Sequence, residues 1–210
     1  MENVLLISGV IVAYLFGSIP TSVWIGRRFY GIDVRTKGSK NAGATNTIRV
    51  LGLKAGLPVL LFDILKGWFS VYVSVFFVPE SYVFSQVILY QIIIAFTVVL
   101  GHVFPVFANF RGGKGIATLL GVGIALYTWA VLVVIAIFAL VLIITKYVSL
   151  GSITASVSFP FLVIFLFNPN SVSLIVLSIF VGVFVPLTHR KNITRLINGN
   201  ESKLDLKKKK

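Results

Sequence analysis

The chain has 210 residues, of which 57% are hydrophobic and only 12% are charged, and its mean hydropathy is +0.99. Because a soluble domain has about 25% charged residues, this composition excludes a water-soluble globule. The 18 Phe residues exclude a disordered chain, and the absence of Cys excludes disulfides, thiolate catalysis and cysteine-based metal sites. The sequence predicts an all-α integral membrane protein.

The net charge is +13, from 19 Lys and Arg against six Asp and Glu, so most cations have no carboxylate partner. Such cations can fix membrane topology, contact anionic lipid headgroups or bind a phosphorylated substrate. Nucleic acid is not an expected partner, because the chain has no separate soluble basic domain.

Apolar runs of about 20 residues predict membrane-spanning helices. Five runs qualify: Val4–Ile25, Ala55–Val78, Tyr82–Phe104, Tyr147–Phe167 and Ser171–Leu187. The uncharged run Ile116–Thr145 is too long for one crossing, and we expect a hairpin that turns near 127–129, with arms of about 12–15 residues.

This hairpin keeps the bases of every loop on one side of the membrane, as cytoplasmic loops require. The prediction is therefore seven transmembrane helices, some of them short, with the N-terminus outside and the C-terminus cytoplasmic. We expect a single polytopic membrane domain over residues 1–200 and a polybasic cytoplasmic tail over 201–210.

The first loop, residues 27–54, combines glycines, small polar side chains and seven bases. Glycines let backbone N–H groups close on an oxyanion, and a following helix N-terminus adds a positive dipole. Ser39, Thr45 and Asn46 can donate hydrogen bonds, and Arg49 can bind a phosphate in bidentate fashion. The alternative is an ordinary basic, turn-rich cytoplasmic loop.

The second loop ends in Arg111-Gly112-Gly113-Lys114-Gly115, directly before an apolar helix. Open backbone, two cations and a helix N-terminus again indicate a phosphate cradle, although the Walker A spacing is absent. A glycine-rich turn with topogenic bases explains this loop nearly as well. Two such loops on one face strengthen the phosphate interpretation.

Asp63 and Lys66 lie three residues apart on one face of the second span, deep in the membrane. They form either a neutralising structural pair or a polar floor beneath a site. Polar residues follow the fifth loop and the last span: Ser149, Ser152, Thr154 and Ser156, then His189, Asn192 and Arg195. The serines and threonine could instead serve helix packing.

The two histidines, His102 and His189, both fall at predicted cytoplasmic helix ends. Neither is followed by Asp five residues later, since Phe107 and Thr194 occupy those places, so the common His-x4-Asp acyltransferase signature is absent, as is the G-x-S-x-G elbow. With two histidines and few carboxylates, no metal site is expected.

Several long motifs follow one another along the chain: Gly17-Ser-Ile-Pro20, the 38–46 loop with Arg49, Asp63–Lys66–Gly67, Gly101–Pro105 with Arg111–Gly115, and His189–Glu201. In this order and over nearly the whole chain, they resemble the bacterial acyl-phosphate-dependent glycerol-3-phosphate acyltransferases of the PlsY type. The resemblance implies a seven-helix enzyme of the bacterial cytoplasmic (inner) membrane, with its active site on the cytoplasmic side.

The implied reaction moves a fatty acyl group from acyl-phosphate to glycerol 3-phosphate, giving 1-acylglycerol 3-phosphate (lysophosphatidate) and phosphate, which begins phospholipid synthesis. Neither acyl-CoA nor acyl-carrier-protein is the implied direct donor, and no metal or organic cofactor is implied. Membrane lipids are the expected surroundings of the acyl chain.

Carried onto matching positions, the resemblance implies a substrate-contacting, catalytic set of six residues: Ser39, Arg49, Lys114, Ser152, His189 and Asn192. Supporting substrate-binding positions are Asn41, Thr45, Asn46, His102, Arg111, Gly112 and Gly113. The proton acceptor implied is the substrate phosphate itself, with a histidine base as the second choice. The rival functions are a carrier for a small phosphorylated anion and a non-catalytic membrane scaffold.

Overall fold

The structure is a computed structural model that describes residues 2–204, and every regular element in that range is a helix. Residues 1–126 and 127–210 form two compact units, which are described separately. The predicted all-α class is confirmed for the described residues. The predicted tail, 201–210, lies outside them from residue 205 onward.

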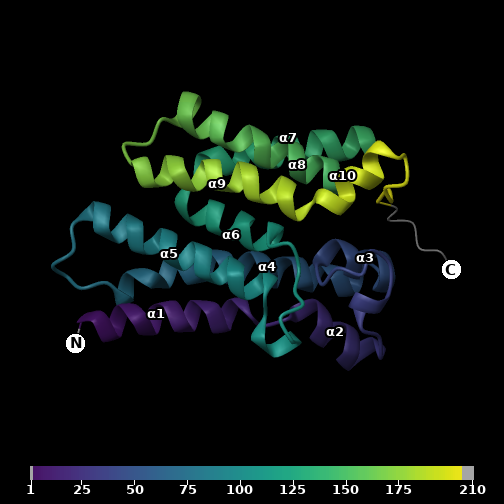
Figure 1. Ribbon diagram of the computed structural model, residues 1–210, viewed down its shortest axis with the longest axis horizontal. Helices are drawn as coiled ribbons and strands as arrows, with labels where there is room; N and C mark the ends of the chain where they lie inside the picture. The colour runs from purple at the N-terminus through teal and green to yellow at the C-terminus, as the bar shows by residue number, and fades with distance from the viewer. Residues whose placement is uncertain (1, 205–210) are drawn as a thin grey trace. The chain divides into compact units, whose positions relative to one another are not determined.

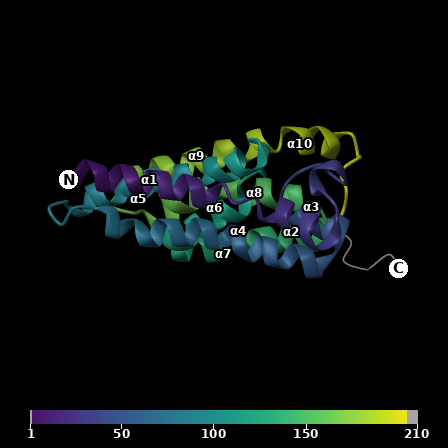
Figure 2. The same ribbon diagram turned by 90° about the horizontal axis from the view of Figure 1, so that it is seen from below.

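In the N-terminal unit, three long helices and the shorter α6 lie side by side, and two further short helices lie at the end away from the N-terminus (Figures 1 and 2). The long helices are α1 (Glu2–Gly17), α4 (Leu53–Val73) and α5 (Phe84–Val103), and the short ones are α6 (Ile116–Leu126), α2 (Thr21–Tyr30) and α3 (Ala44–Leu51). Short 3-10 turns η1 (Val34–Thr36), η2 (Ser74–Phe77) and η3 (Val106–Ala108) lie in the connections.

The chain breaks between α1 and α2 at Ser18–Pro20, where it leaves two carbonyl groups outside the helical pattern. Pro20 has no N–H to donate, and a proline disfavours the helical conformation of the residue before it. The carbonyl groups of Gly17 and Ile19 therefore become available to a side chain, and Lys66 of α4 bonds to both.

Glycines allow α4 and α6 to pack backbone against backbone. A Cβ atom on Gly67 would overlap the carbonyl oxygen of Thr118, and one on Gly121 would overlap that of Ile64. Since lipid tails are as apolar as leucine, close approach through small residues is a main source of helix association in a membrane. This contact holds the start of α6, and with it the second loop, against α4.

The C-terminal unit contains α7 (Thr128–Thr145), α8 (Val148–Phe161) and α9 (Val172–Thr188), which run side by side, and the short α10 (Arg190–Ile197). In Figure 1, α10 continues from the end of α9, and the pair is bent by 59°. A π-helical segment, η4 (Leu162–Phe167), extends α8 beyond Pro160.

Five helical segments of the described chain are long and apolar enough to cross a membrane, and the bent α9–α10 pair makes a sixth. The break in the run 116–145 falls at Tyr127, where it was predicted, but its arms are unequal, with 11 residues in α6 and 18 in α7. An uncharged run gives no signal for the position of a break other than its turn residues, so the arm lengths could not be predicted.

Candidate active site

The first loop is built around the side chain of Asn46, which is 1% exposed. Its amide nitrogen donates to the carbonyl groups of Val34 at 2.8 Å and Asn41 at 3.0 Å, and its oxygen accepts from Ser39 N at 2.8 Å. Asn46 therefore fixes the curve of the loop from the inside. Its neighbour Thr45 is partly buried at the start of α3.

The other predicted residues of this loop are more exposed than Asn46. Ser39 is exposed, and Asn41 and Arg49 are partly buried, with Arg49 in the last turn of α3. The short helix α3 packs against α4, so the loop is held at both ends. A braced backbone that carries an exposed hydroxyl at Ser39 and partly exposed donors at Asn41 and Arg49 is the arrangement that the sequence predicts for anion binding.

The second loop doubles back on the end of α5. Gly112 N donates to Val103 O at 3.1 Å and Gly113 N donates to His102 O at 3.2 Å. Lys114 is partly buried and is followed by Gly115 with φ +80°, after which α6 begins. The first N–H groups of α6 therefore come directly after this glycine–lysine segment. N–H groups at the start of a helix favour the binding of an anion.

Arg35 joins the two loops. Its Nη1 donates to Ala108 O at 2.9 Å and to Arg111 O at 3.4 Å. Its Nε and Nη2 donate hydrogen bonds to the carboxylate of Asp33. Hydrogen bonds from Arg35 hold the pKa of Asp33 well below its usual range, against the opposing effect of burial. The two loops are therefore in direct contact.

Asp63 and Lys66 form a buried ion pair of 2.8 Å, with side chains 3% and 1% exposed. Lys66 Nζ also donates to Ile19 O at 2.9 Å and to Gly17 O at 3.3 Å, and it lies 3.3 Å from His102 Nδ1. The pair is neutralised as the structural interpretation expects. The pair is also linked to the second loop through His102. The ring of His102 contacts Lys66, and its backbone carbonyl accepts a hydrogen bond from Gly113 N.

In the C-terminal unit, one carboxylate gathers the polar side chains. Glu201 accepts from Ser149 Oγ at 2.7 Å, Asn192 Nδ2 at 2.6 Å and Arg195 Nε at 2.6 Å. Burial raises the pKa of Glu201, but the three donors outweigh it and the net pKa is lowered. Asn192 of α10 is thereby fixed relative to α8.

The two other predicted residues of this unit are also buried. Ser152 is 7% exposed and its hydroxyl donates to Val148 O at 3.0 Å. His189, between α9 and α10, is 3% exposed, and its Nδ1 lies 2.9 Å from Val185 O. The three predicted residues Ser152, His189 and Asn192 thus all come from α8 and the α9–α10 bend.

Sequence reasoning missed Glu201 and Arg35 as organising residues. The predicted tail includes Glu201. After Glu80 the sequence has only two acids, Glu201 and Asp205, and Glu201 follows the polar segment 189–195. That isolation was the available signal. Arg35 was counted as one base of a basic loop, and its bonds to residues 73 and 76 positions away leave no trace in the sequence.

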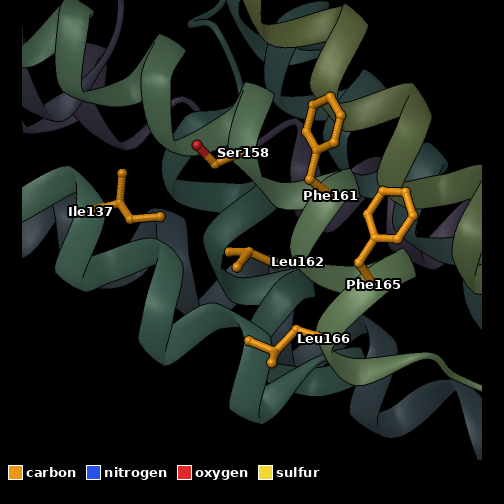
Figure 3. Close-up of a pocket in the computed structure, with 6 residues that line it drawn as sticks. All are labelled: Ile137, Ser158, Phe161, Leu162, Phe165 and Leu166. Atoms are coloured by element: carbon orange, nitrogen blue, oxygen red, sulfur yellow. The ribbon is translucent and has the colours of Figure 1, made fainter.

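An apolar groove of about 580 Å³ lies in the C-terminal unit, lined by Ile137 of α7 and by residues 158–166 at the end of α8 and in η4. Figure 3 shows Phe161 and Phe165 projecting the same way from successive turns, with Ile137 of α7 across the groove. Its one polar lining residue, Ser158, donates its hydroxyl to Thr154 O. The groove therefore offers no group for phosphate chemistry.

A sequence profile described as glycerol-3-phosphate acyltransferase matches residues 7–199 of this chain. The chain belongs to the glycerol-3-phosphate acyltransferase family. It is 43% identical to the glycerol-3-phosphate acyltransferase of Fusobacterium nucleatum, over 92% of this chain and 95% of that protein. It is 43% identical to that of Listeria welshimeri, over 96% and 97% of the two chains.

Two solved acyltransferase structures have the same fold as this chain. A crystal structure of PlsY (YgiH), an integral membrane glycerol 3-phosphate acyltransferase in its glycerol 3-phosphate form, matches with a TM-score of 0.84 and 35% identity, covering 95% of this chain and 96% of that one. The lysophosphatidic acid form of PlsY matches with a TM-score of 0.81 and 34% identity, covering 96% of each chain. This acyltransferase is therefore an integral membrane protein of the PlsY type.

Proposed function

We propose that this protein transfers a fatty acyl group from acyl-phosphate to glycerol 3-phosphate, releasing lysophosphatidate and inorganic phosphate as the first step of phospholipid synthesis. The observation that carries the proposal is the contact between the two basic glycine loops through Arg35. Two phosphate-bearing substrates require two anion-binding elements close together, and the similarity to glycerol-3-phosphate acyltransferases supports glycerol 3-phosphate as one of them.

The protein does not need to activate the acyl donor chemically, because acyl-phosphate is already an activated species. The acceptor hydroxyl of glycerol 3-phosphate attacks the acyl carbonyl carbon, a carbon–oxygen ester bond forms, and the bond from that carbon to the phosphate oxygen breaks. The hydroxyl proton goes to a phosphate oxygen of the substrate. Catalysis is then mainly positioning and charge stabilisation, for which no further cofactor is needed.

Arg49 and Lys114 are the proposed neutralising cations, as they follow the two glycine loops. Ser39, Asn41 and Thr45 are proposed donors to a phosphate, and Asn46 acts by holding the loop that presents them. Arg111, Gly112 and Gly113 are proposed to line the second cradle.

Ser152, His189 and Asn192 are proposed to contact substrate from the C-terminal unit. Their support is that Glu201 and the backbone fix their side chains in buried positions, as a substrate-binding group requires.

The proposed topology has seven crossings: the five long segments, the short α6, and the bent α9–α10 pair. The N-terminus is outside and the C-terminus is cytoplasmic, in the inner membrane of a bacterium, with the site on the cytoplasmic side. Residues 1–200 act as one membrane domain, followed by a basic tail. Within the C-terminal unit, the bond from Leu204 N to Lys146 O supports the same sidedness for these two residues.

The direct test is reconstitution of the purified protein with palmitoyl-phosphate and glycerol 3-phosphate. We expect lysophosphatidate and inorganic phosphate in equal amounts, without added metal or cofactor. Uptake of glycerol 3-phosphate into proteoliposomes without an acylated product would instead indicate a carrier and contradict the proposal.

A further inference from the structure

The Asp63–Lys66 pair also contacts the ring of His102, which charge neutralisation does not require. Lys66 Nζ lies 3.3 Å from His102 Nδ1, whereas the nearest oxygen of Asp63 lies 3.7 Å from the same nitrogen, beyond hydrogen-bond distance. The hydrogen-bond partner of Nδ1 is therefore the lysine.

This contact fixes which ring nitrogen of His102 carries the proton. A lysine ammonium has three donors and no acceptor, so Nδ1 must accept and must be unprotonated. The neutral ring then has its proton on Nε2, since the hydrogen bond at one nitrogen sets the tautomer of the other. The buried group of Asp63, Lys66 and His102 has no net charge in this state, which is the least costly state in a buried setting.

Nε2 of His102 lies at the second loop. A Cβ atom on Gly113 would overlap Nε2 and would lie 2.7 Å from Ala42 O of the first loop, so only glycine leaves this position open. His102 is 7% exposed, and its Nε2 has no hydrogen-bond partner among residues 2–204. An N–H donor without a hydrogen-bond partner among the described residues thus lies beside the glycine that precedes Lys114.

We propose that His102 Nε2–H donates a hydrogen bond to a phosphate oxygen held by the loop Arg111–Gly115, and that Lys66 is a positioning residue that fixes this tautomer. The inference rests on the proposed function and deepens it. It adds a specific donor atom to the phosphate site already proposed at the second loop, and it gives the Asp63–Lys66 pair a role beyond neutralisation.

The tautomer also excludes His102 as the base. A nitrogen that already carries a proton cannot accept one, and the other nitrogen is occupied by Lys66. His189 has the opposite arrangement, because its Nδ1 faces the carbonyl of Val185, which only accepts. The proton of neutral His189 is therefore on Nδ1, and the two histidines of this chain provide opposite tautomers.

The first test uses protein labelled with ¹⁵N in its histidine rings, which gives signals from only two residues. We expect His102 to show a protonated Nε2 and a bare Nδ1, with His189 reversed. Titration with inorganic phosphate should shift the Nε2–H signal of His102, and glycerol should not. A bare Nε2 at His102, or a signal that phosphate leaves unchanged, would overturn the proposal.

The second test compares His102→Gln with His102→Asn. The amide nitrogen of Gln can take the place of Nε2–H, whereas that of Asn reaches only the position of Nδ1. We expect the Gln variant to keep activity within about tenfold of wild type, and the Asn variant to lose roughly 10- to 100-fold in kcat/KM, the size of one hydrogen bond to a charged group. Equal loss in both, with both folded by size-exclusion chromatography, would indicate a base and refute the donor role.

The third test concerns Lys66. Lys66→Met alone leaves Asp63 buried and unpaired, so the double variant Asp63→Asn/Lys66→Met keeps the charge balanced. We expect a mixture of His102 tautomers and about tenfold lower kcat/KM, whereas the matched control Lys54→Met, an exposed lysine at the start of α4, keeps both unchanged. An unaltered tautomer in the double variant would remove Lys66 from this role.

These readouts separate the two proposals. If wild type makes no lysophosphatidate, the proposed function fails, and the phosphate titration still decides whether His102 binds phosphate. If wild type is active and the Asn variant matches it, the role of His102 fails and the function stands.

Discussion

Arg49 and Lys114 are the cations on which the proposed charge stabilisation depends, one from each basic loop. We expect Arg49→Ala and Lys114→Ala each to lower kcat/KM by roughly 100-fold, because a charge-assisted hydrogen bond to phosphate contributes up to about 3 kcal/mol. The measurement is phosphate release at saturating palmitoyl-phosphate. Arg28→Ala, at an exposed arginine of α2, is the control that should keep full activity. Normal turnover in both loop variants would refute the two-cradle site.

Glu201 makes the C-terminal unit sensitive to acid. Its folded pKa lies below the ordinary 4.5, so its contribution to stability is complete above that value and is lost as the pH falls through the folded pKa. We expect the thermal midpoint of wild type in detergent to fall as the pH drops below about 4.5. Glu201→Gln should lower the midpoint at pH 7 and weaken this acid dependence. An equally steep acid loss in the variant would show that other carboxylates cause it.

Among the helices, the closest contact is that of α4 with α6 through Gly67 and Gly121. We expect Gly67→Ala to destabilise the protein by about 1–3 kcal/mol, because a single methyl group would force two backbones apart. The measurement is the thermal midpoint followed by tryptophan fluorescence. Leu61→Ala on the same helix, at a residue 58% exposed, should change it little. If the two variants unfold at the same temperature, this contact does not limit stability.

The helices and the basic loops could be predicted from sequence because apolar length and charge are local properties. A break within 116–145 was also predictable, since a turn in this uncharged run keeps the loop bases on one side, and the residues 127–129 indicated where it falls. The contacts of Arg35 with Ala108 and of Lys66 with His102 could not be predicted, because they join residues 73 and 36 positions apart through tertiary packing. Glu201 was missed because one acid beside many bases is typical of a solvated tail.

For the whole molecule, the cysteine-free sequence allows a direct test of topology. Single cysteines can be placed at Lys37, Glu80 and Ser202, all exposed positions outside the apolar segments. In intact spheroplasts, an impermeant maleimide should label only the variant at residue 80, and permeabilisation should make the other two reactive. Labelling of residue 37 from outside would reverse the proposed orientation.

The identity of the acyl donor tests the central claim most directly. Two contacting basic loops suit a donor that brings its own phosphate, and the account predicts lysophosphatidate from palmitoyl-phosphate but not from palmitoyl-CoA or palmitoyl-acyl-carrier-protein at equal concentration. The measurement is the initial rate of product formation by the purified protein with each donor. A rate with palmitoyl-CoA that equals or exceeds the rate with palmitoyl-phosphate would contradict it.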